Sequence, residues 1–285
     1  MEVNDASHQI IADLLADRTG QQLTESRRWR IGTALSGLFR ERGIDNLDQL
    51  VCLLGHPDEK GLEQEIVEAL LNNETYFFRD KPTFDQLPDD VVPQLAKQRA
   101  KERKISIWCA GCSTGQEAYS LAMQFADQPE RWSGWRIEIL GTDISQNAIT
   151  TAQRGVYSQF QVQRGLGVGQ MLSHFHEVPD GWEIKHDTVS NVRFRQHNLL
   201  GELPLQQKFD LILCRNVLLY FDAINREKAF QRLHSVLAND GYLMLGAGET
   251  VVGQTSAFSP SRSRASIYVP AGARPVDHNS LPIAV

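Results

Sequence analysis

Hydrophobic residues recur at helical spacing through the first seventy residues of the chain. They fall three or four positions apart in three groups: Ile31, Ala34, Leu35 and Leu38; Leu47, Leu50, Val51 and Leu54; and Leu62, Ile66, Ala69 and Leu70. This spacing places each group on one face of a helix, so we expect residues 1–71 to form a small all-α bundle. Residues 72–104, which contain three prolines and end in a basic run, are expected to form a connector.

From residue 105 onward, short β-rich runs alternate with helical patterns. The expected strands are residues 105–108, 135–143, 192–196, 209–214, 242–245 and 265–269. The expected helices are residues 116–125, 146–154 and 230–237. Alternation of this kind predicts an α/β domain, in which helices cover a parallel sheet, over residues 105–269.

Two segments depart from this rhythm. Residues 155–190 contain a Val-Pro-Asp-Gly turn at 178–181 between two short extended runs. We therefore expect an inserted antiparallel β-subdomain there. Residues 270–285 are polar and contain proline, which predicts a mobile C-terminal tail.

The composition is that of an ordinary globular protein. Of the 285 residues, 41% are hydrophobic and 22% charged, which excludes collagen-like, wholly disordered and coiled-coil chains. The net charge of −6 argues against a broad nucleic-acid-binding surface, because such a surface needs a basic face that displaces counterions.

The location of the protein is also indicated by its sequence. No apolar run approaches the roughly 18 residues of a membrane helix, and the polar, acidic N-terminus is unlike a secretory signal. Four cysteines without such a signal do not suggest a disulfide framework. We expect a cytoplasmic protein with reduced thiols and no membrane insertion.

The first candidate site is the segment WCAGCSTGQE, residues 108–117, which follows an expected strand and opens an expected helix. Three interpretations are open. Cys109 and Cys112 have the spacing of a thiol redox pair. A zinc site would need a second pair of ligands. Gly111 and Gly115 would let the backbone approach a nucleotide-type ligand at the end of a strand, and this position favours the third interpretation.

Two acidic residues near this loop have alternative roles. Asp143 ends the second expected strand, where a carboxylate can accept hydrogen bonds from ribose hydroxyls, but it can also cap the following helix. Glu117 can bind a ligand, or it can form a capping box with Thr114. The two roles of Glu117 are compatible.

Three further segments place polar residues where a ligand could bind. In NETYFFR, residues 73–79, Arg79 could hold a carboxylate with its forked guanidinium. In QHNLL, residues 196–200, Asn198 could contact an adenine edge or simply form a turn. Arg79 could instead be an ordinary surface residue.

The third segment is FDLILCRNVLLYFD, residues 209–222. Arg215 and Asn216 follow its buried strand, at the expected crevice of an α/β sheet. Tyr220 comes about one turn later, and it could instead be a packed ring with a solvated hydroxyl.

Together these segments resemble the CheR-type chemotaxis receptor glutamate O-methyltransferases. The matching segments occur in order over about residues 5–269: NETYFFR, WCAGCSTGQEAYSLA, ILGTDIS, HNLL, FDLILCRNVLLYFD and GYLMLGAGE. The resemblance implies an N-terminal helical domain followed by a Rossmann-like methyltransferase domain with an inserted β-subdomain. It also implies methyl transfer from S-adenosylmethionine to glutamates in the cytoplasmic domains of methyl-accepting chemoreceptors, leaving S-adenosylhomocysteine.

The resemblance further implies a set of site residues and no metal. Those expected to bind the cofactor are Asn73, Thr75, Arg79, Ala110, Gly111, Glu117, Asp143, Asn198, Leu199, Arg215 and Asn216. Arg79 and Tyr220 resemble the pair beside the transferred methyl group. One departure is Gln116, which stands where the family often has a second glutamate and makes the expected pocket less negative.

Positive charge gathers in the N-terminal helices. Residues 18–42 contain six arginines against two glutamates, although the whole chain is acidic. Arg27, Arg28 and Arg30 could therefore bind an acidic receptor helix, and a solvated helix surface is the alternative. The turn at 178–181 is short beside the loop of family members that dock on a receptor's C-terminal pentapeptide, so we expect methylation that does not depend on one.

Three other functions remain open at this point. The chain could be a non-catalytic module that binds S-adenosylmethionine or S-adenosylhomocysteine in signalling. It could be a thioredoxin-like reductase that uses Cys109 and Cys112. It could also be a methyltransferase that acts on a small molecule or a nucleic acid, of which the acidic composition disfavours the latter.

Overall fold

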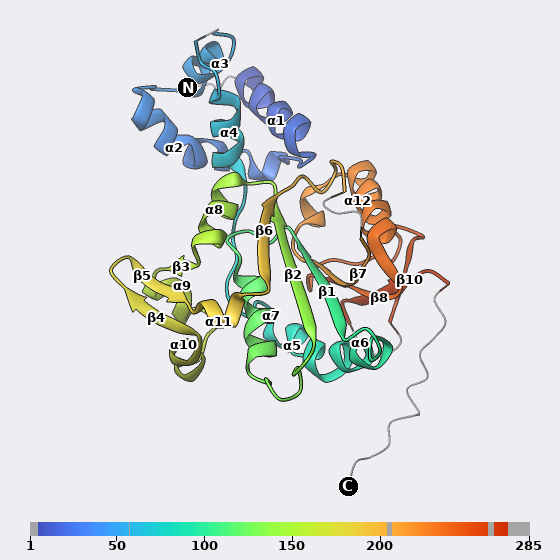
Figure 1. The fold of residues 1–285 in the computed structure, drawn as a ribbon. Coiled ribbons are helices and arrows are strands. Elements are labelled where there is room, and N and C mark those ends of the chain that lie inside the picture. The colour runs from blue at the N-terminus through green and yellow to red at the C-terminus, as the bar shows by residue number, and fades with distance from the viewer. Residues whose placement is uncertain (1–4, 57, 204–206, 262–264, 273–285) are drawn as a thin grey trace.

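The chain forms helices first and then a mixed sheet with helices on both faces (Figure 1). The computed structural model describes residues 5–56, 58–203, 207–261 and 265–272. None of the helices in these ranges combines the length and the apolar character that crossing a bilayer requires. The tail expected over residues 270–285 lies outside the described residues from position 273 onward.

Residues 5–71 form the N-terminal lobe. Its elements are α1 (Asp5–Thr19), the 3-10 turn η1 (Glu25–Arg27), α2 (Arg30–Arg42), α3 (Leu47–Leu54) and α4 (Leu62–Leu70). Helix α2 buries Ile31, Leu35 and Leu38, and it packs against α4. It ends where Gly43 adopts a left-handed conformation with φ of 64°, a frequent signal for a helix end. The apolar spacing seen in the sequence is therefore the inner face of these helices.

The segment expected as a connector contains helices. They are α5 (Lys81–Phe84), the π-helical turn η2 (Leu87–Val91) and α6 (Val92–Gln98). Each of the three prolines lies in the first turn of one of them, where the missing N–H has no helical partner to lose. Phe84, Leu87 and Leu95 are fully buried in the core beside the sheet. The three prolines of the expected connector thus mark helix starts.

The main sheet confirms the predicted α/β fold class. Its strands are β1 (Lys104–Ala110), β2 (Arg136–Asp143), β6 (Val192–Gln196), β7 (Phe209–Cys214), β8 (Leu237–Leu245), β9 (Phe258–Pro260) and β10 (Ile267–Pro270). Their spatial order is β6-β2-β1-β7-β8-β10-β9, and the first five are parallel. Strand β10 runs antiparallel to both of its neighbours. The order of the strands along the chain reverses at β1, which is the switch point of a Rossmann-like sheet.

Helices cover both faces of this sheet. They are α7 (Gln116–Ala126), α8 (Gln146–Arg154), α11 (His186–Val189) and α12 (Ala223–Val236). Side chains of β1 alternate between two cores, as the period of a strand requires. Ile105 and Ile107 join the core that includes α7, whereas Trp108 joins the core that includes Phe230 of α12. The sheet is therefore buried on both sides, as a parallel sheet normally is.

The inserted antiparallel subdomain is also confirmed. It comprises β3 (Val156–Tyr157), α9 (Gln159–Gln163), α10 (Val168–His174), β4 (Phe175–Val178) and β5 (Gly181–Ile184), with strand order β3-β5-β4. The ring of Phe77 meets the rings of Tyr157 and Phe175 edge to face, with centroids 5.2 and 5.5 Å apart. These contacts attach the subdomain to the segment that leads out of the N-terminal lobe.

The segment that follows α1 in the N-terminal lobe also contacts the loop after β7 and helix α12. The N–H of Gln22 donates to the carbonyl of Tyr220 at 2.7 Å, and Asn225 Nδ2 donates to the carbonyl of Gly20 at 3.2 Å. Gly20 has φ of 77°, and a Cβ there would lie 2.2 Å from Leu200 Cδ1. The positive φ favours glycine, and any other residue would also have to displace the Leu200 side chain.

Glu249 holds the loop that follows β7. Its carboxylate accepts hydrogen bonds from the backbone N–H groups of Asn216, Val217, Leu218 and Gly246, at 2.7 to 3.0 Å. Hydrogen bonds to an ionised acceptor are shorter and stronger than neutral ones. One side chain from the loop after β8 thereby fixes the loop that carries several expected site residues.

We predict that Glu249→Gln lowers the free energy of unfolding by about 2 kcal/mol, because an amide NH₂ would replace an acceptor and leave backbone donors unpaired. Urea titration followed by circular dichroism measures this change. The control is Glu130→Gln on an exposed loop, which should stay within about 0.5 kcal/mol of wild type. Equal stability of both variants would contradict the role given to Glu249.

Candidate functional site

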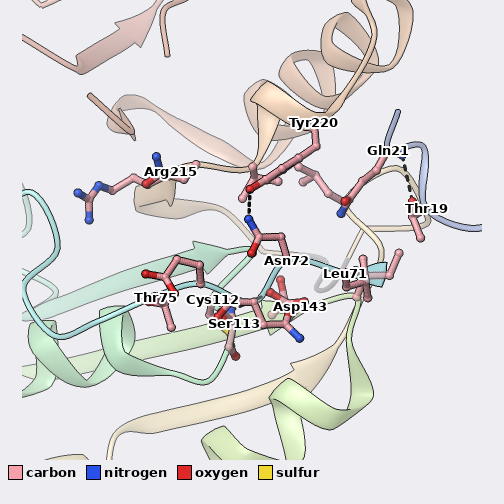
Figure 2. A pocket seen from close by; sticks show the side chains of 18 of the residues that line it. Thr19, Gln21, Leu71, Asn72, Thr75, Cys112, Ser113, Asp143, Arg215 and Tyr220 are labelled. Atoms are coloured by element: carbon pink, nitrogen blue, oxygen red, sulfur yellow. Dashed lines mark hydrogen bonds between the residues drawn. The ribbon is translucent and has the colours of Figure 1, made fainter. Parts of the chain in front are cut away.

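A pocket lies at the carboxyl ends of β1, β2, β6 and β7, beneath the N-terminal lobe (Figure 2). It is a hollow of about 840 Å³, part of it open to solvent. Crevices at this edge, beside the switch point of a parallel sheet, are where such folds bind ligands. Its walls are formed by Thr19, Gln21, residues 71–75, Arg79, residues 111–113, Glu117, residues 142–144, residues 197–199, residues 215–217, Tyr220 and Phe221.

The glycine loop brings backbone to the floor of this pocket. Gly111 has φ of 78°, and a Cβ there would lie 2.3 Å from Val217 Cγ2. Its N–H donates to the carbonyl of Thr142 at 2.8 Å, which ties the end of β1 to the end of β2. Ala110, the preceding residue, is 2% exposed and packs in the core, so it does not line the pocket.

Asp143 organises the loop and also faces the pocket. Its carboxylate accepts hydrogen bonds from the N–H of Ser113 at 2.7 Å and of Ser145 at 2.9 Å. Ser145 itself caps α8 by accepting from the N–H of Ala148. Burial raises the pKa of Asp143, while the bonded N–H groups oppose this rise. Each carboxylate oxygen has a further lone pair, so hydroxyl groups of a ligand can still donate to it.

A buried ion pair lies in the wall formed by α7 and the loop after β7. Arg215 Nη1 is 2.8 Å from Glu117 Oε2, and Arg215 Nη2 is 3.0 Å from Asp80 Oδ2. The side chain of Arg215 is 1% exposed. Burial raises the pKa of Glu117, and the guanidinium acts in the opposite direction.

The capping box, which the sequence left open as one role for Glu117 with Thr114, does not form. Helix α7 has Gly115 at its N-cap with φ of 94° and no side-chain cap. The hydroxyl of Thr114 donates to Gln116 Oε1 instead, and Glu117 turns toward the pocket. Because Gly115 adopts a left-handed conformation at the start of α7, the carboxylate of Glu117 points toward Arg215 and not toward the backbone N–H groups of its own helix.

The segment after α4 supplies Asn73, Thr75 and Arg79 to one wall. The carbonyl of Asn73 accepts from the hydroxyl of Ser113 at 2.7 Å, which joins this segment to the glycine loop. Arg79 Nη1 donates to the carbonyl of Glu74 at 2.8 Å. This bond uses one of five guanidinium N–H groups, so Arg79 retains donors for a ligand.

The opposite wall carries Tyr220. Its hydroxyl accepts a hydrogen bond from Asn72 Nδ2 at 2.6 Å. The guanidinium carbon of Arg27 lies 5.3 Å from the centroid of its ring, a cation–π distance. Of the three arginines expected to bind a substrate, Arg27 thus reaches a wall residue, whereas Arg28 and Arg30 are not part of the pocket lining.

The end of β6 forms the remaining wall. Asn198 Oδ1 accepts from the N–H of Leu200 at 2.9 Å, and Asn198 Nδ2 donates to the carbonyl of Arg18 at 3.3 Å. Leu199, beside it, is 8% exposed and offers an apolar surface. The turn and the pocket position, which the sequence left as alternatives for Asn198, occur together.

Sequence reasoning missed several lining residues. Thr19 and Gln21 come from the segment after α1, and Asn72 immediately precedes the NETYFFR segment. No periodic pattern or motif marks these residues, because the segment after α1 reaches Tyr220 only through tertiary contacts. Glu249 was within a matched segment, but nothing in its spacing indicated its backbone partners.

The CxxC pair does not have the environment of a redox site. Cys109 and Cys112 are 0% and 2% exposed, and both are free thiols. Burial raises both pKa values, so the thiols stay protonated, whereas thiol exchange needs a thiolate. Among the described residues, no group of three His, Cys, Asp or Glu side chains could hold a metal ion.

The polar groups of the pocket fit S-adenosylmethionine. Glu117 and Asp143 are acceptors suited to an ammonium group and a ribose diol, and Arg79 is a donor suited to a carboxylate. The Oδ1 atom of Asn216 is buried and has no partner among the described residues, so the wall contains an unsatisfied acceptor. Leu199 adds an apolar surface of the kind against which a flat aromatic ring can pack.

Comparison with known proteins agrees with this assignment. The family model described as CheR methyltransferase, SAM binding domain, matches residues 73–267. Chemotaxis protein methyltransferase Cher2 of Pseudomonas putida is 34% identical over 82% of this chain and 86% of its own length.

Two other relatives cover still more of the chain. Chemotaxis protein methyltransferase 1 of Pseudomonas aeruginosa is 33% identical over 88% of this chain and 92% of its own. The chemotaxis protein methyltransferase of Vibrio parahaemolyticus is 32% identical over 93% of this chain and 96% of its own. The pocket, the sheet and these matches over most of the sequence show that the chain belongs to the CheR methyltransferase family.

Proposed function

We propose that this protein transfers a methyl group from S-adenosylmethionine to glutamate side chains in the cytoplasmic domains of chemoreceptors, giving methyl esters. Family membership supports methylation in chemotaxis. The observation that carries the finer proposal is the meeting of Arg79, Tyr220 and the Arg215–Glu117 pair in one pocket between two lobes. Such a pocket can bind a charged cofactor while the mouth stays open to an acidic partner.

The chain's own residues would hold the cofactor along the pocket. Asp143 would accept hydrogen bonds from the ribose hydroxyls, and Asn198 with Leu199 would flank the adenosine. The Gly111 loop would face the methionine part. The remaining polar contacts would come from Asn73, Thr75, Arg79, Glu117, Arg215 and Asn216.

The reaction needs positioning more than acid–base chemistry. Bound S-adenosylmethionine supplies an electrophilic methyl group on a sulfonium, whose C–S electron pair returns to sulfur as the glutamate oxygen forms the new C–O bond. A glutamate carboxylate, with a pKa of about 4.3, is already ionised at pH 7, so no general base is required. Alignment of the reacting atoms can contribute about 7–11 kcal/mol.

Arg79 and Tyr220 are the residues we assign to the acceptor side. The free N–H groups of Arg79 can bind the incoming carboxylate and steer it toward the methyl group. An ion pair that is too tight would reduce the nucleophilicity of the glutamate oxygen. The hydrogen bond from Arg79 to the carbonyl of Glu74 limits how far the guanidinium can move toward that carboxylate. Tyr220 can orient the carboxylate by hydrogen bonding.

The receptor is proposed to approach over the N-terminal lobe, in the cytoplasm and without a nucleic acid or an inserted membrane segment. Arg27, Arg28 and Arg30 lie at the start of α2 and just before it, and Arg27 contacts the ring of Tyr220. An acidic receptor helix bound there would bring its glutamates to the pocket mouth. The two-residue turn between β4 and β5 supports independence from a receptor pentapeptide, because it offers little surface for one.

The test of this function is transfer of labelled methyl from S-adenosylmethionine to a panel of chemoreceptor cytoplasmic fragments, each with and without its C-terminal tail. We expect base-labile label on glutamate, at rates that do not depend on the tail. Tight cofactor binding with no transfer to any fragment would favour the non-catalytic module instead. In the variant Arg79→Ala, the rate of methyl transfer should fall by a larger factor than the affinity for the cofactor.

The basic surface can be tested by charge reversal. We predict that Arg28→Glu combined with Arg30→Glu lowers kcat/KM for the receptor about tenfold at low salt and much less at high salt, because dissolved salt screens the long-range steering of an acidic partner by partly exposed charges. Arg27 is left intact since it contacts Tyr220.

The matched control reverses Arg131, in the turn after α7, and Arg154, at the end of α8, which gives the same change in net charge. Its kcat/KM should remain close to that of wild type at every salt concentration. An identical salt dependence for both double variants would assign Arg28 and Arg30 to an ordinary solvated surface.

A further inference from the structure

Asn72 makes a direct contact with Tyr220 across the pocket. Asn72 Nδ2 lies 2.6 Å from the Tyr220 hydroxyl oxygen and donates to it. The two side chains come from segments 148 positions apart in the chain and meet where both line the pocket, as the dashed line in Figure 2 shows. Asn72 was not among the residues expected at the site.

The rest of Tyr220 is already fixed by other contacts. Its carbonyl accepts from the N–H of Gln22 at 2.7 Å, and its own N–H donates to the carbonyl of Val217 at 3.2 Å. The guanidinium of Arg27 lies over its ring. The main freedom left to this residue is therefore rotation of the hydroxyl proton about the C–O bond.

The bond from Asn72 restricts that rotation. A tyrosine hydroxyl has one proton to donate and lone pairs that accept. Because Asn72 donates a hydrogen bond to the oxygen, the hydroxyl proton cannot point at the amide nitrogen. It is left to be donated elsewhere, and a carboxylate oxygen is a strong acceptor for it.

We propose that Asn72 is a positioning residue for methyl transfer, which sets the hydroxyl of Tyr220 to donate its proton to the glutamate carboxylate that receives the methyl group. The hydrogen bond from Tyr220 then holds one carboxylate oxygen while the other attacks. No proton is transferred, because the ester forms from the ionised carboxylate. This inference rests on the function proposed above.

The position of Asn72 explains why it can do this. It directly follows Leu71, the C-cap of α4, and precedes Asn73, whose carbonyl is bonded to the glycine loop. Its backbone is thus tied to the N-terminal lobe on one side and to the sheet on the other.

The experiment compares wild type, Asn72→Leu, Asn72→Asp, Tyr220→Phe and the double variant Asn72→Leu with Tyr220→Phe. Asn72→Leu keeps the shape of the side chain and removes the amide. Asn72→Asp keeps the shape but can only accept, so it would take the hydroxyl proton for itself. For each protein we would measure kcat at saturating receptor fragment, KM for S-adenosylmethionine, and the affinity for labelled S-adenosylhomocysteine by equilibrium dialysis.

We expect Asn72→Leu and Asn72→Asp to lower kcat by about fivefold or more, the scale of one hydrogen bond, with KM for the cofactor and affinity for the product within about twofold. In the Tyr220→Phe background, Asn72→Leu should lower kcat no further, because the hydroxyl it acts on is absent. Unchanged product affinity separates this result from a collapsed pocket.

Wild-type kcat in either Asn72 variant would overturn the proposal. So would a loss from Asn72→Leu that is just as large in the Tyr220→Phe background, since the effect would then not pass through the hydroxyl. If the wild-type protein itself transfers no label to any receptor fragment, the proposed function fails, and that outcome is distinct from failure of the role of Asn72.

Discussion

The pocket depends on the ion pairs that the buried guanidinium of Arg215 forms with Glu117 and Asp80. The side chain of Arg215 is 1% exposed, and it is bonded to Glu117 of α7, to Asp80 and to the carbonyl of Arg79. A charge removed from water in this way is tolerated only when its partners are in place, and loss of one partner from such a pair costs about 3–5 kcal/mol. The segment after α4, helix α7 and the loop after β7 are therefore held in one arrangement.

In this arrangement, residues of both lobes position the side chains of the site. Arg79 is positioned by the segment that leaves the N-terminal lobe, and Tyr220 is positioned by Gln22 from the segment after α1. Glu249 fixes the loop that carries Tyr220 from the opposite side. A glutamate that reaches the mouth of the pocket would meet groups whose geometry is set before it arrives, which is what an alignment-driven reaction requires.

The sequence was most informative where local pattern and tertiary structure agree. Strands β6 and β7 have the bounds expected from their apolar runs, and α8 begins after Ser145 and ends at Gly155, both common helix boundaries. Most of the expected cofactor residues line one pocket because strand ends meet at one edge of a parallel sheet. The cofactor and the reaction were implied by the segments that resemble the methyltransferase family, because the position of these residues in the sheet does not indicate them.

The failures have physical causes in long-range contacts. The segment expected as a connector contains helices that begin around Pro82 and around two further prolines, because a proline in the first turn of a helix loses no hydrogen bond. Glu117 had the spacing of a capping box, but Gly115 turned the helix so that the carboxylate pairs with a residue 98 positions later. The bonds from Asn72 to Tyr220 and from Glu249 to the β7 loop join distant segments without any periodic signal.

The most direct test of this account is an isothermal calorimetric titration of the purified protein with S-adenosylhomocysteine, the demethylated product that should occupy the same pocket. The account predicts saturable binding of one equivalent by the wild-type protein, and binding at least about tenfold weaker by Glu117→Gln, which removes the charge paired with Arg215. A titration of folded wild-type protein that shows no saturable heat would contradict the claim that this pocket binds the methyl donor.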